Sequence, residues 1–185
     1  MHFTLTDLLT DIAQNGAESG ASMVELHINE VDSSGKEEFC FTVKDNGKGM
    51  TDTELQQALD PFVSYGIKQG LLKHPHRKVG LGLPFLIQTA ESSGGGWEIK
   101  SEGTGTTVSA WFDLSNVDTP PIGDIPGMFR TVLLFAGPEE VVINRTINGN
   151  CVAQVRKTGL VDALGTLEDA QSLILLDKYL RGMEN

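Results

Sequence analysis

The chain has 185 residues, of which 39% are hydrophobic and 21% charged, a composition that allows one well-buried core in a globular protein. Its net charge of −11 excludes nucleic acid and anionic membranes as expected partners, because binding to polyanions depends on clustered Lys and Arg. A small anion needs only a local set of donors, so it is still allowed.

Features that would place the chain outside the cytoplasm are not found. The first twenty residues carry three acidic side chains and lack a basic start followed by an apolar run, so we expect no signal peptide. No apolar run approaches the roughly 20 residues that a membrane-spanning helix needs. The two cysteines, Cys40 and Cys151, are too few for a disulfide framework or a zinc cluster, so we expect buried, reduced thiols.

The first predicted element is a helix over residues 3–19, which has an apolar side and a polar stripe. Asp11 and Asn15 lie on that stripe one helical turn apart, and Gly20 then ends the helix. Alternating apolar residues predict strands near residues 24–29 and 39–43. The turn between them makes a hairpin, which brings Asp45 to a strand end.

The second half of the predicted domain alternates helices with a further hairpin. Thr51 and Glu54 form a capping box for a helix that ends near Leu59. Residues 60–79 lack periodicity and are longer than an ordinary connection, so we expect a lid or binding loop there. A helix should follow from Gly82 to about Ser93. A second hairpin should pair residues 97–101 with 106–112.

A change of composition divides the chain. Residues 115–124 are rich in Pro and Gly and predict a linker between an α/β domain over residues 1–114 and a small α/β extension over residues 125–185. In the extension we expect a helix near 126–135, strands near 140–146 and 151–157, and a helix near 167–181.

Asp45 is the first candidate site residue. A carboxylate at a strand end accepts a hydrogen bond from an exocyclic amine such as that of adenine, and Gly47 and Gly49 let the backbone approach a ring. The same residues also fit an ordinary Asp-Asn-Gly turn. A calcium-binding EF-hand loop is excluded, because glycines stand at positions that need side-chain oxygens and Met50 stands at the position of the loop's glycine.

Asp11 and Asn15 predict a second group of ligands on one helix face. An amide oxygen suits Mg²⁺, which takes one or two oxygens from protein and the rest from phosphates and water. Asp11 is then left to orient or deprotonate a nucleophile. Taken alone, the two side chains equally fit a solvated helix face.

A glycine-rich segment opens the helix expected after residue 81. Glycines at a helix N-terminus expose backbone amides that bind phosphate, so Gly80 and Gly82 are candidates for an anion site. A Rossmann motif is excluded, because Phe85 stands where the third glycine is required. The basic residues of the preceding loop, Lys68 among them, taken alone fit a solvated loop.

These segments together resemble the ATP site of the GHKL superfamily. Residues 11–22 look like its N-box, V-K-D-N-G-K-G-M at 43–50 its adenine-binding box, K-V-G-L-G-L-P at 78–84 its G2 box, and G-T-G-T-T at 103–107 its G3 box. The resemblance implies a Bergerat fold: an α+β two-layer sandwich with a mixed, mainly antiparallel sheet and helices on one face. It also implies these ligands of Mg-ATP: Asn15, Asp45, Gly47, Gly49, Met50, Lys68, Gly80, Leu81, Gly82, Leu83 and Thr107.

Within that resemblance Asn15 would hold Mg²⁺ and Asp11 would act as catalytic base. Hydrolytic branches such as MutL and gyrase carry Glu at the position of Asp11, and the shorter side chain argues against fast hydrolysis. The chain shows no H-box helix. We therefore expect a stand-alone ATPase or protein kinase subunit that acts with a separate protein, or alternatively an ATP-gated interaction module.

Partners and assembly are less constrained. The Pro-Pro-Ile-Gly-Asp segment at 120–124 is similar to small ATP-binding proteins that bacteria encode beside iron-hydrogenase or NADH-dehydrogenase-type subunits, which suggests a redox complex. The final helix has apolar residues that fit either a homodimer interface or cover for the domain. The sequence leaves open whether ATP is hydrolysed, transferred or only bound.

Overall fold

The computed structural model describes residues 3–33, 35–60, 82–101 and 103–183. They contain one six-stranded sheet with the strand order β3-β4-β2-β1-β5-β6. All neighbouring strands are antiparallel except β1 and β5, which are parallel. The strands are β1 (Met23–Ser33), β2 (Lys36–Asp45), β3 (Gly96–Ser101), β4 (Thr106–Asp113), β5 (Glu140–Ile147) and β6 (Asn150–Arg156).

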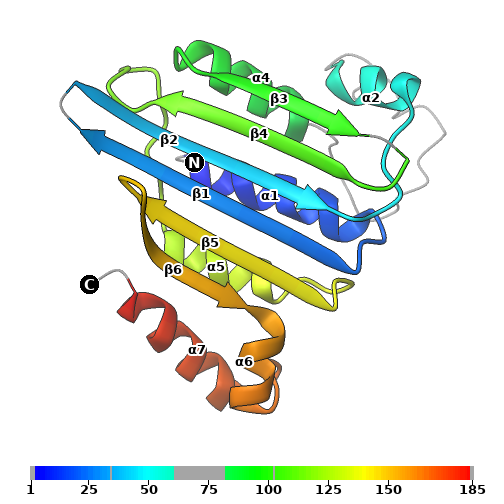
Figure 1. The fold of residues 1–185 in the computed structure, drawn as a ribbon, viewed down its shortest axis with the longest axis vertical. Coiled ribbons are helices and arrows are strands. Elements are labelled where there is room, and N and C mark those ends of the chain that lie inside the picture. Colours follow the sequence, from blue (N-terminus) through cyan, green and yellow to red (C-terminus); the bar gives the residue numbers. More distant parts are fainter. Residues whose placement is uncertain (1–2, 34, 61–81, 102, 184–185) are drawn as a thin grey trace.

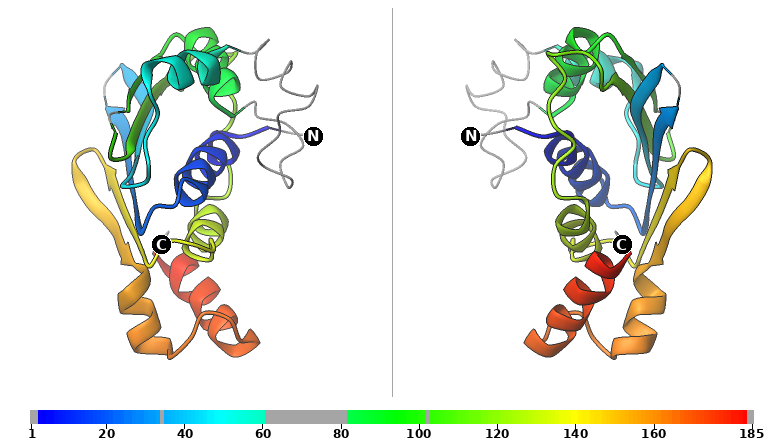
Figure 2. Two further views of the ribbon diagram at one scale, coloured as in Figure 1. Left: turned by 90° about the vertical axis from the view of Figure 1, so that its right-hand side faces the viewer. Right: turned by 90° about the vertical axis from the view of Figure 1, so that its left-hand side faces the viewer.

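Most of the helices lie on one face of this sheet (Figures 1 and 2). The core lies between the sheet and α1, α4, α5 and α7, and contains buried side chains from both layers, such as Leu8, Leu26, Phe41, Leu86 and Phe129. This confirms an α+β two-layer sandwich with a mixed, mainly antiparallel sheet. The helices are α1 (Leu5–Glu18), α2 (Asp52–Leu59), α4 (Gly82–Ser92), α5 (Ile125–Leu133), α6 (Lys157–Leu164) and α7 (Ala170–Gly182).

The first helix and hairpin form as local sequence dictates. Thr4 caps α1 and forms a capping box with Asp7, and a run of apolar residues from Leu5 to Ala17 is buried on one side. Gly20 follows α1 with φ +83°, a conformation that favours glycine. In β1, Val24, Leu26 and Ile28 are buried, which confirms the predicted alternation. α1 therefore runs across the sheet and ends beside the end of β2.

Residues 125–183 extend the same sheet. β5 pairs in parallel with β1 over eight residue pairs from Met23 to Glu30, and β6 forms the edge of the sheet beyond it. α5 packs against α1, and α7 packs against α5. The segment 115–124 passes from β4 to α5 along the start of α1, where Leu5 and Thr6 donate backbone hydrogen bonds to Pro121 and Ile122.

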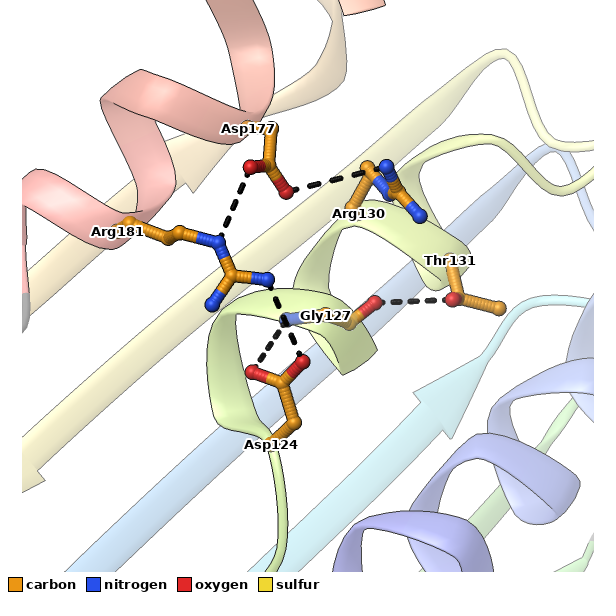
Figure 3. Close-up of polar contacts among 6 residues, drawn as sticks. All are labelled: Asp124, Gly127, Arg130, Thr131, Asp177 and Arg181. Atoms are coloured by element: carbon orange, nitrogen blue, oxygen red, sulfur yellow. Dashed lines mark hydrogen bonds and ion pairs between the residues drawn. The ribbon is translucent and has the colours of Figure 1, made fainter. Parts of the chain in front are cut away.

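A polar junction joins α7 to the beginning of α5 (Figure 3). Asp124 caps α5 by accepting from the Gly127 amide at 3.1 Å, and its carboxylate lies 3.6 Å from Arg181. Arg181 also donates to Asp177 at 3.0 Å, and Asp177 lies 3.8 Å from Arg130. Because these side chains are about half exposed, the buried Leu176 and Leu180 contribute more to docking than the charges do.

The helix expected near residues 167–181 is confirmed as α7, but a further helix that was not predicted, α6, lies before it. α6 follows β6 directly at Lys157, and α7 begins only at Ala170, capped by Asp169. α6 contains Gly159, has no side-chain cap and buries none of its residues, so its sequence lacks the usual helix signals. Contacts from elsewhere hold its first turn: Lys157 donates to two carbonyls of the segment before β5.

Glu140 at the start of β5 also holds the first turn of α6. Its carboxylate accepts from the Thr158 hydroxyl at 2.6 Å and lies 3.8 Å from Arg156. Burial raises the pKa of Glu140, but the hydrogen bonds from Thr158 and from the Val141 amide, with the charge of Arg156, more than offset it, so the pKa lies below its ordinary value.

Two further expectations concern the cysteine thiols and membrane-spanning helices. Both cysteines are free, as expected, but Cys151 is exposed and Cys40 only half-buried, so the prediction that both thiols are buried is wrong. Cys151 is exposed because it is the second residue of an edge strand, next to a turn. Among the described residues, no helix is long and apolar enough to cross a membrane.

Candidate functional site

A cavity of about 390 Å³ lies where the second half of α1 meets the end of β2, one side of α2 and the start of α4. Its volume falls within the range of small-molecule sites. It combines apolar walls with a few polar groups. Its lining consists of Ile12, Asn15, Gly16, Glu18, Ser19, Val43, Asp45, Lys48, Gly49, Met50, Glu54, Gln57, Ala58, Gly82, Leu83, Thr106 and Val108.

Asp45 is the buried carboxylate of this cavity, with 8% of its surface exposed. Its Oδ1 accepts from the Gly47 amide at 2.8 Å and from the Ser19 hydroxyl at 3.1 Å. Oδ2 accepts no hydrogen bond from the part of the chain that the structure describes. No fully buried side-chain oxygen or nitrogen there lacks a partner, so Oδ2 must still be reachable from the cavity.

Glycines let several backbone segments approach Asp45 closely. A Cβ at Gly16 on α1 would lie 3.1 Å from the Asp45 Cβ. Gly105 has φ +116°, and a Cβ there would overlap the Asp45 carbonyl oxygen. Gly49 has φ +65°, and a Cβ there would lie 3.1 Å from the Gly105 carbonyl oxygen. The loop after β2 and the β3–β4 turn therefore meet around Asp45.

Ser101 joins these two loops. The Met50 amide donates to the Ser101 hydroxyl at 2.8 Å, and that hydroxyl lies 2.9 Å from the Thr106 hydroxyl. Thr106 lines the cavity beside Val108. Thr107, the predicted threonine, is not in the lining: successive residues of a strand point to opposite faces, and Val108, Ala110 and Phe112 are buried beneath the helices. The structure thus brings Thr106 to the cavity in place of Thr107.

Asn15 and Asp11 lie beside the start of α4. A Cβ at Gly82 would be 3.5 Å from the Asn15 Nδ2 and 3.7 Å from the Asp11 Cβ, so α4 begins against this face of α1. Asn15 and Leu83 line the cavity, whereas Asp11 is exposed and does not. The expected phosphate-binding region and the expected metal ligand therefore lie close together.

Other predicted residues fall elsewhere. Gly47 packs against Ser19 behind Asp45 and does not line the cavity. Lys68, Gly80 and Leu81, with most of the predicted lid, lie outside the described residues. Sequence reasoning missed Ser19, Lys48 and Glu54 in the lining. Only Ser19 and Lys48 lie within segments that resemble GHKL motifs, residues 11–22 and 43–50, so the sequence held a signal for these two and none for Glu54.

The charged residues of the lining are mainly acidic. The described lining residues include three carboxylates, Glu18, Asp45 and Glu54, and one cationic side chain, Lys48. Hydrogen bonds from the Thr51 amide and hydroxyl, with the nearby charge of Lys48, hold the pKa of Glu54 below its ordinary value. Glu54 is therefore ionised at neutral pH, and an anionic ligand would need further positive charge in this cavity.

Residues 2–116 match the family model of the histidine kinase-, DNA gyrase B- and HSP90-like ATPases, which covers more than half of the chain. The chain belongs to this family. This confirms the GHKL resemblance and makes the chain a GHKL ATPase-like nucleotide-binding domain. A search of curated proteins found no match.

Two solved structures are similar to this GHKL chain. The N-terminal domain of a DNA repair protein is 13% identical with a TM-score of 0.49, over 82% of this chain and 52% of that one. The Aquifex aeolicus MutL ATPase domain, complexed with ADP, is 15% identical with a TM-score of 0.40, over 85% of this chain and 65% of that one. The chain thus spans about half to two thirds of their lengths.

Proposed function

We propose that this GHKL domain binds ATP together with Mg²⁺ in the described cavity, and acts as an ATPase or protein kinase subunit with a separate partner protein. One observation carries the proposal. Asp45 is buried at the cavity wall with Oδ1 held by two internal donors and Oδ2 left to accept from a ligand.

The adenine amine is the donor that this carboxylate suits. A hydrogen bond to a charged group contributes about 1.5 to 3 kcal/mol, which corresponds to roughly 10- to 150-fold in affinity. Ile12, Val43 and Val108 supply apolar wall for the flat ring, and Gly16 and Gly49 allow it close to the backbone. Thr106 takes the role that the sequence had suggested for Thr107.

The residues present also fit Mg²⁺ brought in with the nucleotide. Among the described residues no three His, Cys, Asp or Glu side chains cluster as a metal site, so the ion would depend on the phosphates for most of its ligands. Asn15 offers one amide oxygen at the cavity, beside the start of α4. The positive end of the α4 dipole and the bound cation together would offset the acidic lining.

Equilibrium titration tests the proposal. Wild type should bind Mg-ATP, with affinity falling when the cation is chelated. Asp45→Asn keeps the internal acceptor Oδ1 and replaces only Oδ2, so ATP affinity should fall at least tenfold. ITP carries a carbonyl at position 6, which the new amide can face as a donor, so the preference for ATP over ITP should also shrink.

Asp118→Asn is the matched control, because Asp118 is an exposed loop carboxylate that does not line the cavity. It should bind ATP as wild type does. Absence of ATP binding by the wild-type protein would overturn the proposal. Equal ATP affinity in Asp45→Asn and Asp118→Asn would instead remove Asp45 from it.

A second candidate function is an ATP-gated interaction module without appreciable turnover. Asp11 favours it, because this expected base is exposed and is not part of the cavity lining, and a general base must reach the proton that it abstracts. Phosphate release by wild type and by Asp11→Asn distinguishes the two. A base at Asp11 predicts at least a hundredfold loss in the variant, whereas phosphate release no faster than background in wild type favours the binding module. Equal, measurable rates in the two proteins would show only that Asp11 is not the base.

A further inference from the structure

Ser19 stands between α1 and the loop that follows β2. It is the C-cap residue of α1, and its carbonyl accepts from the Lys48 amide at 3.4 Å. Its hydroxyl lies 3.1 Å from the Asp45 Oδ1. On its other side, a Cβ added to Gly47 would overlap the hydroxyl. Ser19 therefore contacts the last residue of β2, Asp45, and two residues of the loop that follows, Gly47 and Lys48. It also lines the cavity.

We propose that Ser19 is a positioning residue that makes the site select purines with a 6-amino group over those with a 6-keto group. The proposal rests on the proposed function, because it concerns how Asp45 meets the base. Ser19 acts through Asp45: its hydroxyl helps to fix the plane of the carboxylate, so that Oδ2 is presented to the cavity as an acceptor.

The hydrogen-bond geometry supports this role. Two donors converge on Oδ1, the Gly47 amide at 2.8 Å and the Ser19 hydroxyl at 3.1 Å. The Gly47 amide alone would leave the carboxylate plane free to turn about that contact, because the terminal torsion of Asp is broad. A second donor from another direction restricts this rotation. The side chain of Asp45 is then pre-organised before the ligand arrives.

The single proton of Ser19 has two acceptors within reach. The Gly16 carbonyl lies 2.7 Å from the hydroxyl and already accepts from the Ser19 amide. The Asp45 carboxylate is farther away but charged, and hydrogen bonds to charged acceptors are the stronger ones. The proton is therefore shared, so loss of the hydroxyl should have the effect of one ordinary hydrogen bond and not that of a charged pair.

The contacts at Oδ1 also determine which ligand group is accepted. Both partners are donors there, so the carboxylate stays an acceptor and Oδ2 needs a donor from the ligand. A 6-amino group supplies one. A 6-keto oxygen places lone pairs against Oδ2, and a well-fixed carboxylate has little freedom to turn away from it. Discrimination between ATP and ITP should therefore depend on Ser19.

The test compares three variants in titrations with ATP and ITP. Ser19→Ala removes the hydroxyl and should weaken ATP binding about fivefold while ITP binding changes little, so that the ATP/ITP ratio falls about fivefold. Ser19→Thr keeps a hydroxyl and should retain most of the ratio. Ser22→Ala is the matched control, because Ser22 accepts from Asn46 on the outer side of the same loop at 2.9 Å.

Urea unfolding of each variant separates recognition from folding. A purely structural role for Ser19 predicts equal losses for ATP and ITP, and that result, or an unchanged ratio, would overturn the proposal. If wild type binds ATP and Asp45→Asn weakens binding while Ser19→Ala does not change the ratio, only this inference fails. If wild type binds no ATP, the proposed function fails as well.

Discussion

Gly47 tests how tightly the loop after β2 packs against α1. A Cβ at this position would overlap the Ser19 hydroxyl, lie 2.7 Å from the Ser19 Cβ and lie 2.9 Å from the Asp45 Oδ1. The φ angle of Gly47 is not in the left-handed region, so the conflict in Gly47→Ala is steric. Turning the Ser19 hydroxyl away does not remove it, because the Ser19 Cβ is also too close.

The expected effects follow from this geometry. Overpacking of a close contact costs typically 1 to 3 kcal/mol, so the free energy of unfolding of Gly47→Ala should fall by about that amount. Because Ser19 and Asp45 must both shift, ATP affinity should fall more than about tenfold, the loss expected for one charge-assisted hydrogen bond. The loss of affinity should exceed that of Ser19→Ala alone.

Gly159→Ala is the control. Gly159 lies inside α6, and a Cβ there would meet nothing within 4 Å. Replacing a helical glycine by alanine should raise the free energy of unfolding by roughly 0.5 to 1 kcal/mol and leave ATP binding unchanged. Urea unfolding and ATP titration are the two assays. Wild-type stability and affinity in Gly47→Ala would refute the packing; lost stability with unchanged affinity would refute its part in recognition.

Three further changes test other contacts. Thr106→Val should weaken ATP binding several-fold whereas Thr107→Val should not, and the reverse result in titration would restore the prediction made from sequence. Arg145→Ala leaves Glu30, its partner at 2.7 Å, as a half-buried unpaired charge, so the free energy of unfolding should fall by about 3 kcal/mol in chemical denaturation. The double variant Arg145→Met, Glu30→Leu removes both charges and should recover most of this stability. A loss in the double variant as large as in Arg145→Ala would contradict the cost assigned to the unpaired charge. The pKa of Glu140 is lower in the folded state than its unfolded value near 4.5, so the ionised Glu140 stabilises the fold above that pH and this stabilisation is lost as pH falls. The difference in free energy of unfolding between wild type and Glu140→Gln should therefore shrink from pH 7 to about pH 3.5. A difference that stays constant over this range would contradict the contacts of Glu140.

Much of the fold could be predicted because local patterns and tertiary contacts agree there. The apolar side of α1 and the alternation of Val24, Leu26 and Ile28 match their burial. α6 could not be predicted, because tertiary contacts to Lys157 and Thr158 hold it in place of helix signals. The parallel pairing of β5 with β1 could not be predicted either, because the paired residues are more than a hundred positions apart and local sequence patterns do not determine such pairing.

The site was predictable in its motifs and less so in its side chains. Asp45 and Asn15 were predicted because their segments resemble GHKL motifs, and the structure places both in the lining of the cavity. Thr107 was chosen over Thr106 although the strand alternation with Val108 already favoured Thr106. Ser19 lies within a segment that resembles a GHKL motif, but its contact with Asp45 could not be predicted, because that contact depends on how the end of α1 meets the loop after β2.

A crystal structure of the protein with an adenine nucleotide and Mg²⁺ tests the proposed nucleotide site most directly. We predict the base in the described cavity with its 6-amino nitrogen about 2.7 to 3.2 Å from the Asp45 Oδ2, while Oδ1 keeps its contacts with Gly47 and Ser19. A nucleotide bound elsewhere, or in this cavity with Asp45 turned away from the base, would show that Asp45 does not recognise adenine.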